Sequence, residues 1–183
     1  MKKLLFLLSL LFAIAAPISV NAQKIILKKF TPNESDYQLK IRQDILDYLE
    51  EEKNLTVSVS YGDAVFFSFE EEGVTYKLAF ELPFKDDPKI VFVNFYIFSE
   101  YNNKYDPRVY AYAKQRMDNF RTIKSLYNND KKYFVISTEM YIANPENFND
   151  IFDKVKDLLR YLYIKILPEE CERAQYDLRR MSR

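Results

Sequence analysis

Apolar and polar residues alternate along several short stretches of the chain, and this alternation predicts most of its β-strands. The clearest stretch covers residues 74–82, where every second residue is apolar and the residues between are mostly polar. A period of two places the apolar side chains on one buried face of a strand. Short turns separate neighbouring stretches, which is typical of antiparallel hairpins. The expected strands are residues 55–61, 64–70, 74–82, 89–99, 122–127 and 131–140.

Three longer stretches carry the period of an α-helix. The expected helices are residues 33–53, 106–120 and 144–167. Ser35 is the expected N-cap of the first helix, because Gln38 follows it at the spacing of a capping box. The third helix has the widest apolar stripe, and we expect Pro168 to end it. A polar tail is then expected from about residue 169 to residue 183.

The expected elements follow one another in the order α-ββββ-α-ββ-α. Strands that come in runs, and do not alternate with helices, predict an antiparallel sheet. The expected fold class is therefore α+β, with about five to six strands and helices packed mainly on one face. Residues 23–183 have the length of a single domain.

Residues 1–22 have the pattern of a cleaved secretory signal peptide. Two lysines precede an apolar run over residues 4–16, and residues 20–22 provide a peptidase site before Gln23. The run is shorter than the roughly 20 residues of a membrane-spanning helix, so an uncleaved anchor is the weaker alternative. The leader predicts a periplasmic or secreted protein without a stable membrane anchor after cleavage.

Composition argues against several classes of function. The chain holds 27 basic and 27 acidic residues, so no excess of positive charge favours nucleic acid as a partner. It has no histidine, which excludes Ser-His-Asp and Cys-His pairs and histidine-containing zinc sites. Its two glycines, Gly62 and Gly73, are too few for a glycine-rich nucleotide-binding loop. We therefore expect a protein without enzyme activity, catalytic residues or a cofactor.

Acidic clusters occur at residues 50–52, 70–72 and 86–87. Calcium takes such oxygen ligands, but none of these clusters has the alternating spacing of a calcium loop. We interpret them as solvated surface charge and expect no metal site.

Cys171 is the single cysteine, so an intrachain disulfide is excluded. The neighbouring Glu170 and Glu172 disfavour its thiolate, which argues against a reactive nucleophile. In an oxidising compartment, a disulfide between two chains is the alternative.

One layer of helices covers only one face of a sheet. Alternate residues of a strand point to opposite faces, so their odd or even position (their parity) identifies the side chains on the uncovered face. The aromatic residues of that parity are Phe66, Phe92, Tyr96, Phe98 and Tyr133. A contiguous aromatic patch on an open sheet is typical of a docking surface for a peptide or a second subunit. The alternative is that another helix or the tail covers these side chains. We take these five residues as the candidate binding site.

Several stretches together resemble the fold shared by the YbjN-type proteins and the type III secretion chaperones. They are residues 41–49 (IRQDILDYL), 65–69 (VFFSF) and 136–140 (ISTEM), followed by the helix at 144–167. The resemblance implies a leading helix, a meander of strands, a middle helix, a hairpin and a closing amphipathic helix. It also implies a protein that binds peptides or unfolded segments, commonly as a dimer, and has no catalytic residues.

Our first hypothesis is an exported, non-enzymatic module that binds a peptide or protein. Binding would use the open sheet face, a strand edge or a dimer interface, and a homodimer is one such assembly. The second hypothesis is a small hydrolase or lyase that uses carboxylates or tyrosine in a cleft. The third is a carrier that holds a small apolar ligand between the sheet and the third helix.

Overall fold

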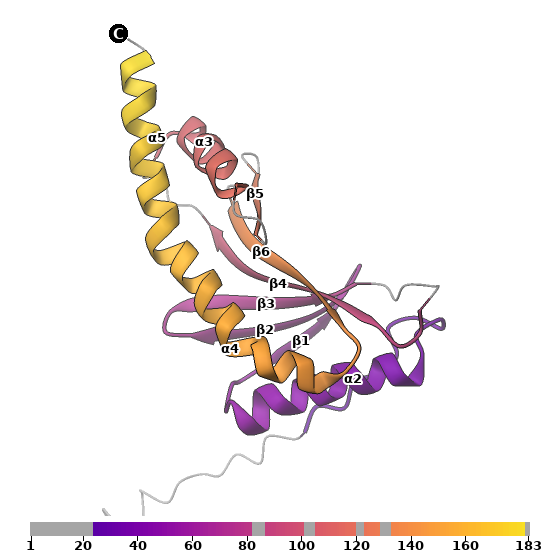
Figure 1. Cartoon of the computed structure of the whole chain (residues 1–183). Helices are drawn as coiled ribbons and strands as arrows, with labels where there is room; N and C mark the ends of the chain where they lie inside the picture. The colour runs from indigo at the N-terminus through magenta and orange to yellow at the C-terminus, as the bar shows by residue number, and fades with distance from the viewer. Residues whose placement is uncertain (1–23, 82–86, 101–104, 120–122, 129–132, 182–183) are drawn as a thin grey trace, which may run out of the picture.

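The computed structural model describes residues 24–81, 87–100, 105–119, 123–128 and 133–181. The predicted signal peptide lies outside the described residues. The described chain forms a six-stranded antiparallel sheet with the strand order β1-β2-β3-β4-β6-β5 (Figure 1). Its strands are β1 (Ser58–Tyr61), β2 (Val65–Glu71), β3 (Val74–Phe80), β4 (Val91–Glu100), β5 (Lys124–Asn128) and β6 (Tyr133–Ile142).

Helices α2 and α4 pack on one face of this sheet, and α3 packs against α5 and β5 beyond its end (Figure 1). The helical segments are α2 (Asp36–Asp47), the π-turn η1 (Tyr48–Glu52), α3 (Pro107–Met117), α4 (Pro145–Tyr161), the π-turn η2 (Leu162–Ile166) and α5 (Leu167–Met181). The α+β class, the order of the elements and the one-sided helical layer are confirmed.

Local sequence signals set where the helices begin. The Oγ of Ser35 accepts a hydrogen bond from the backbone N–H of Gln38 at 3.1 Å, and the backbone N–H of Ser35 donates to the Gln38 side chain at 3.0 Å. This is the expected capping box. Helix α4 begins at a different local signal, because the side chain of Asn144 accepts a hydrogen bond from the backbone N–H of Glu146 and Pro145 occupies the first turn.

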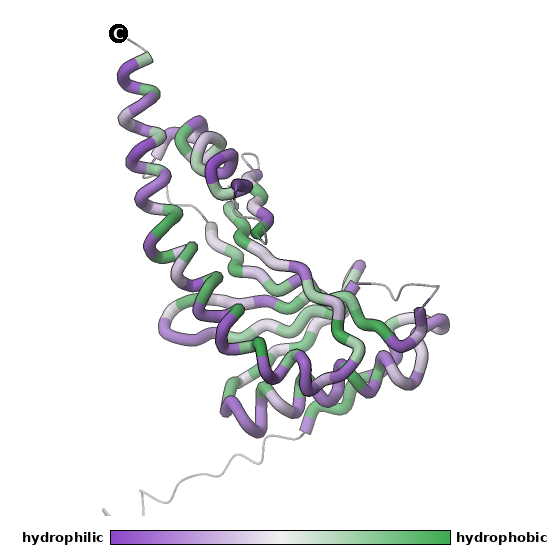
Figure 2. Tube along the Cα trace, viewed as in Figure 1, coloured by the Kyte–Doolittle hydropathy of each residue, from purple (hydrophilic) through white to green (hydrophobic). Residues whose placement is uncertain are grey.

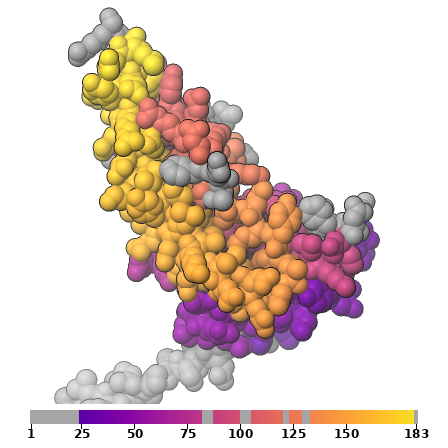
Figure 3. Space-filling model, viewed as in Figure 1, coloured from indigo at the N-terminus to yellow at the C-terminus, as the bar shows by residue number. Residues whose placement is uncertain are grey.

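The closing helix does not end at Pro168, so that prediction was wrong. It continues through η2 and α5 to Met181 and extends past the sheet beside α3 (Figure 3). Proline disrupts a regular helix because it lacks the N–H and its ring meets the carbonyl four residues earlier. Here the turn before Pro168 is a π-turn, in which the N–H of Leu167 donates to the carbonyl of Leu162. The wider turn accommodates the ring within a continuous helix.

The residues expected to form a tail bury one stripe against α3. Cys171 and Ala174 of the expected tail are buried and continue the stripe from Leu167 at helical spacing, and Leu178 packs beside them. Arg116 of α3 adds ion pairs to Glu170 and Asp177. The stripe is narrow and most of α5 is polar, as its colouring in Figure 2 shows. A short apolar stripe inside a charged segment explains why the sequence suggested a tail.

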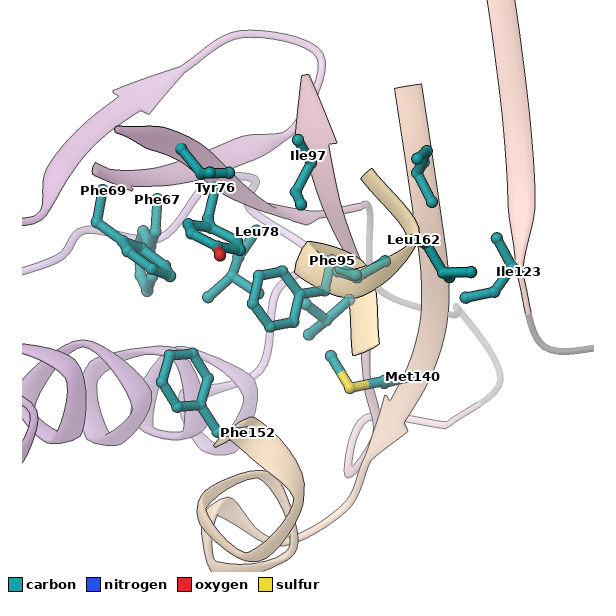
Figure 4. Close-up of a cluster of buried hydrophobic side chains, with 14 of the residues drawn as sticks. Phe67, Phe69, Tyr76, Leu78, Phe95, Ile97, Ile123, Met140, Phe152 and Leu162 are labelled. Atoms are coloured by element: carbon teal, nitrogen blue, oxygen red, sulfur yellow. The ribbon is translucent and has the colours of Figure 1, made fainter. Parts of the chain in front are cut away.

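Aromatic side chains fill the space between the sheet and α4. Phe152 of α4 stacks on Phe95 of β4, with ring centroids 5.7 Å apart and planes only 2° from parallel. Phe69 and Tyr76 from β2 and β3 complete this group (Figure 4). These side chains occupy the region in which the carrier hypothesis placed an apolar ligand.

Candidate functional site

The second face of the sheet carries the side chains of opposite parity, and α2 and α4 lie on the other side. Its register places Phe66 of β2 beside Ala79 of β3, and Ala79 beside Asn94 of β4. In the next row Lys77 lies beside Tyr96. Small or flexible side chains on β3 therefore lie between larger ones on β2 and β4.

This contrast in side-chain size creates a hollow of about 820 Å³ on the open face. Ala79 is small and only 6% exposed, so it forms part of the floor of the hollow and does not contribute to its walls. The wall-forming apolar side chains come from the four strands β2, β4, β5 and β6, and they are Phe66, Tyr96, Phe98, Leu126, Tyr133 and Val135. The hollow is open to solvent, and its volume lies in the range of small-molecule and cofactor sites.

Four of the five residues proposed from sequence come together in this hollow. Phe66, Tyr96, Phe98 and Tyr133 line it, and the rings of Phe98 and Tyr133 lie 5.1 Å apart. Phe92 shares their face but does not line the hollow, because its ring packs on Tyr141 with centroids 5.2 Å apart.

The cover that the alternative interpretation required is not found among the described residues. The segment expected to be a tail forms α5 and packs on α3. All five aromatic side chains keep partial contact with solvent. In the described part of the chain, the aromatic face is therefore open.

The hollow also contains polar residues outside the five predicted from the sequence. Asn94 lies at its floor, and its side-chain Oδ1 is buried without a hydrogen-bond donor among the described residues. Lys77 holds its Nζ 5.2 Å from the centre of the Phe98 ring, a cation–π contact. An asparagine inside the apolar stretch at 89–99 was the available signal, but its neighbours depend on strand register.

Tyr96 combines an aromatic wall with a hydrogen-bonding group. Burial raises the pKa of its phenol, and the negative charge of Asp63 raises it further. The hydroxyl group therefore stays protonated at neutral pH and remains a donor. Aromatic surface, a phenol and a buried amide oxygen are features of recognition by shape and hydrogen bonding.

The acidic clusters carry ion pairs where the structure describes them. Glu71 pairs with Lys156 at 2.6 Å, Glu72 pairs with Arg160, and Glu51 pairs with Lys24 at 2.9 Å. Asp86 of the third cluster lies outside the described residues. Within the described ranges, histidine, cysteine and carboxylate groups form no cluster of three or more suited to a metal ion.

Cys171 lies in α5 on the side that faces α3, and it is only 1% exposed. A disulfide to a second chain requires an accessible sulfur at bonding distance. In this conformation, α5 would have to separate from its surroundings before such a bond formed.

Comparison with family models, with curated proteins and with solved structures found no match for this chain. Over the residues that the structure describes, no helix has the length and apolar character needed to cross a membrane.

Proposed function

We propose that this chain is a non-enzymatic module that binds a peptide segment of another protein in the hollow of its open sheet face. The observation that carries the proposal is the convergence of aromatic walls from separate strands around a small floor residue, Ala79. The predicted leader adds that the protein works in the periplasm or outside the cell. The resemblance to peptide-binding proteins of the YbjN and secretion-chaperone type supports the same class of function.

Asn94 supports a polypeptide as the ligand. Its buried Oδ1 has no donor among the described residues, and a buried polar atom left unpaired costs about 1–3 kcal/mol. A backbone N–H of a bound segment supplies the missing donor. Aromatic walls beside it accept an apolar side chain of the same segment. Extended peptides are commonly recognised by this combination of main-chain bonds and side-chain pockets.

Replacing Tyr96 with serine is expected to weaken peptide binding about tenfold or more, since buried aromatic anchors dominate such interfaces. The probes are peptides selected by the purified protein from a phage-displayed library of random 12-residue sequences. Their dissociation constants are measured by fluorescence anisotropy. Phe92→Ser is the matched control, because Phe92 lies on the same strand and face outside the hollow; it should change affinity less than twofold.

Circular dichroism of both variants separates lost binding from lost folding. If Tyr96→Ser unfolds, Ser68→Trp fills the same hollow from β2 and replaces it in the test. Equal affinities for the wild type and a folded hollow variant would contradict the proposal. So would a protein dimer that Tyr96→Ser converts to monomers, because that result assigns the face to a second copy.

A further inference from the structure

The charges around the hollow are separated along its length. Asp63 and Glu81 lie at one end, where Val65 and Phe80 are register partners at the end of the β2–β3 ladder. Both carboxylates are exposed, and neither has an ion-pair partner among the described residues. Lys77 lies further along β3, with its ammonium group over Phe98 and with no carboxylate partner among the same residues. One end of the hollow is therefore acidic.

The spacing of these residues matches the period of an extended chain. Lys77, Ala79 and Glu81 are consecutive side chains on one face of the β3 stretch. Consecutive same-face side chains of any extended segment are about 7 Å apart, because each residue rises about 3.3 Å. A segment aligned with β3 that places an apolar side chain over Ala79 brings the side chain two residues away to Glu81 and Asp63.

Charge complementarity then defines the partner. We infer that the bound segment is extended and carries a lysine or arginine two residues from the apolar side chain that enters the hollow. The basic group faces Asp63 and Glu81, which have no counter-charge of their own in the described structure. This inference rests on the proposed function, since it describes the segment that occupies the same hollow.

The test compares peptides selected by the wild-type protein with peptides selected by the Asp63→Asn/Glu81→Gln variant. The same phage-displayed library is used for both. Wild-type selections should be enriched in lysine or arginine two residues from an aromatic or large aliphatic residue, and the variant should lose this enrichment. A wild-type-selected peptide should bind the variant about tenfold more weakly, since two surface charge pairs are removed.

Glu70→Gln is the matched control. Glu70 is an exposed carboxylate on the same face of β2 outside the hollow, so its loss should leave both enrichment and affinity unchanged. Two results would overturn this inference while the proposed function stands. One is an equal loss of peptide affinity in Glu70→Gln. The other is a set of selected peptides that depend on Tyr96 for binding but show no enrichment in lysine or arginine. A wild-type protein that selects no peptide above background would overturn both.

Discussion

Replacing Phe152 with alanine is expected to lower the free energy of unfolding by about 3–5 kcal/mol, the range for removing a buried phenylalanine. Phe152 is fully buried where α4 meets the sheet. Its ring stacks on Phe95 and also meets Phe69, Tyr48 and Phe148, with centroids 5.4 to 6.0 Å away. Alanine would remove ring contacts to η1, to strands β2 and β4, and within α4 itself.

Urea unfolding followed by circular dichroism measures this loss. Ile151→Ala is the matched control, because Ile151 precedes Phe152 on α4 but is 37% exposed. The control should lose well under half as much stability, since less apolar surface returns to water. Similar losses for the two variants would contradict the position of α4 on the sheet.

Removing one partner of the Glu34–Arg42 ion pair is expected to cost about 3–5 kcal/mol of folding stability. The side chains are only 4% and 2% exposed. The Nε and Nη2 of Arg42 each donate to a carboxylate oxygen of Glu34 at 2.7 Å. Glu34 also accepts from the backbone N–H of Phe30. Arg42→Met would therefore leave a buried carboxylate without its counter-charge.

The double variant Glu34→Leu/Arg42→Met tests whether the stability lost in each single variant comes from the charge left without its partner. Replacing both charges by apolar groups removes the desolvation cost together with the attraction. We expect the double variant to be at least 2 kcal/mol more stable than the less stable single variant, as measured by urea unfolding. Simple addition of the two single losses would contradict a directly coupled buried pair.

The strands could be predicted because one face of the sheet is buried and the other is not. Every second residue from Val74 to Phe80 is buried, as the alternation in this stretch predicts. The caps of α2 and α4 could also be predicted, because each depends on residues within one helical turn. The extension past Pro168 could not, since it depends on contacts with α3 more than 50 residues earlier.

The candidate site, too, could be predicted from the sequence only in part. Parity was sufficient to select Phe66, Tyr96, Phe98 and Tyr133, because parity decides the face of a strand. It could not separate Phe92 from them, since that distinction depends on which side chains lie on neighbouring strands. The hollow itself exists because Ala79 lies between Phe66 and Asn94, and this depends on the register of three strands.

A map of the binding surface in solution tests peptide binding in the hollow most directly. Amide chemical shifts of isotope-labelled protein are recorded while a selected peptide is added. Binding in the hollow predicts that the largest changes occur at Lys77, Ala79, Asn94 and Tyr96, around the hollow on the open face. Changes concentrated on α2 and α4, or confined to the β1 edge with none around Ala79, would contradict it.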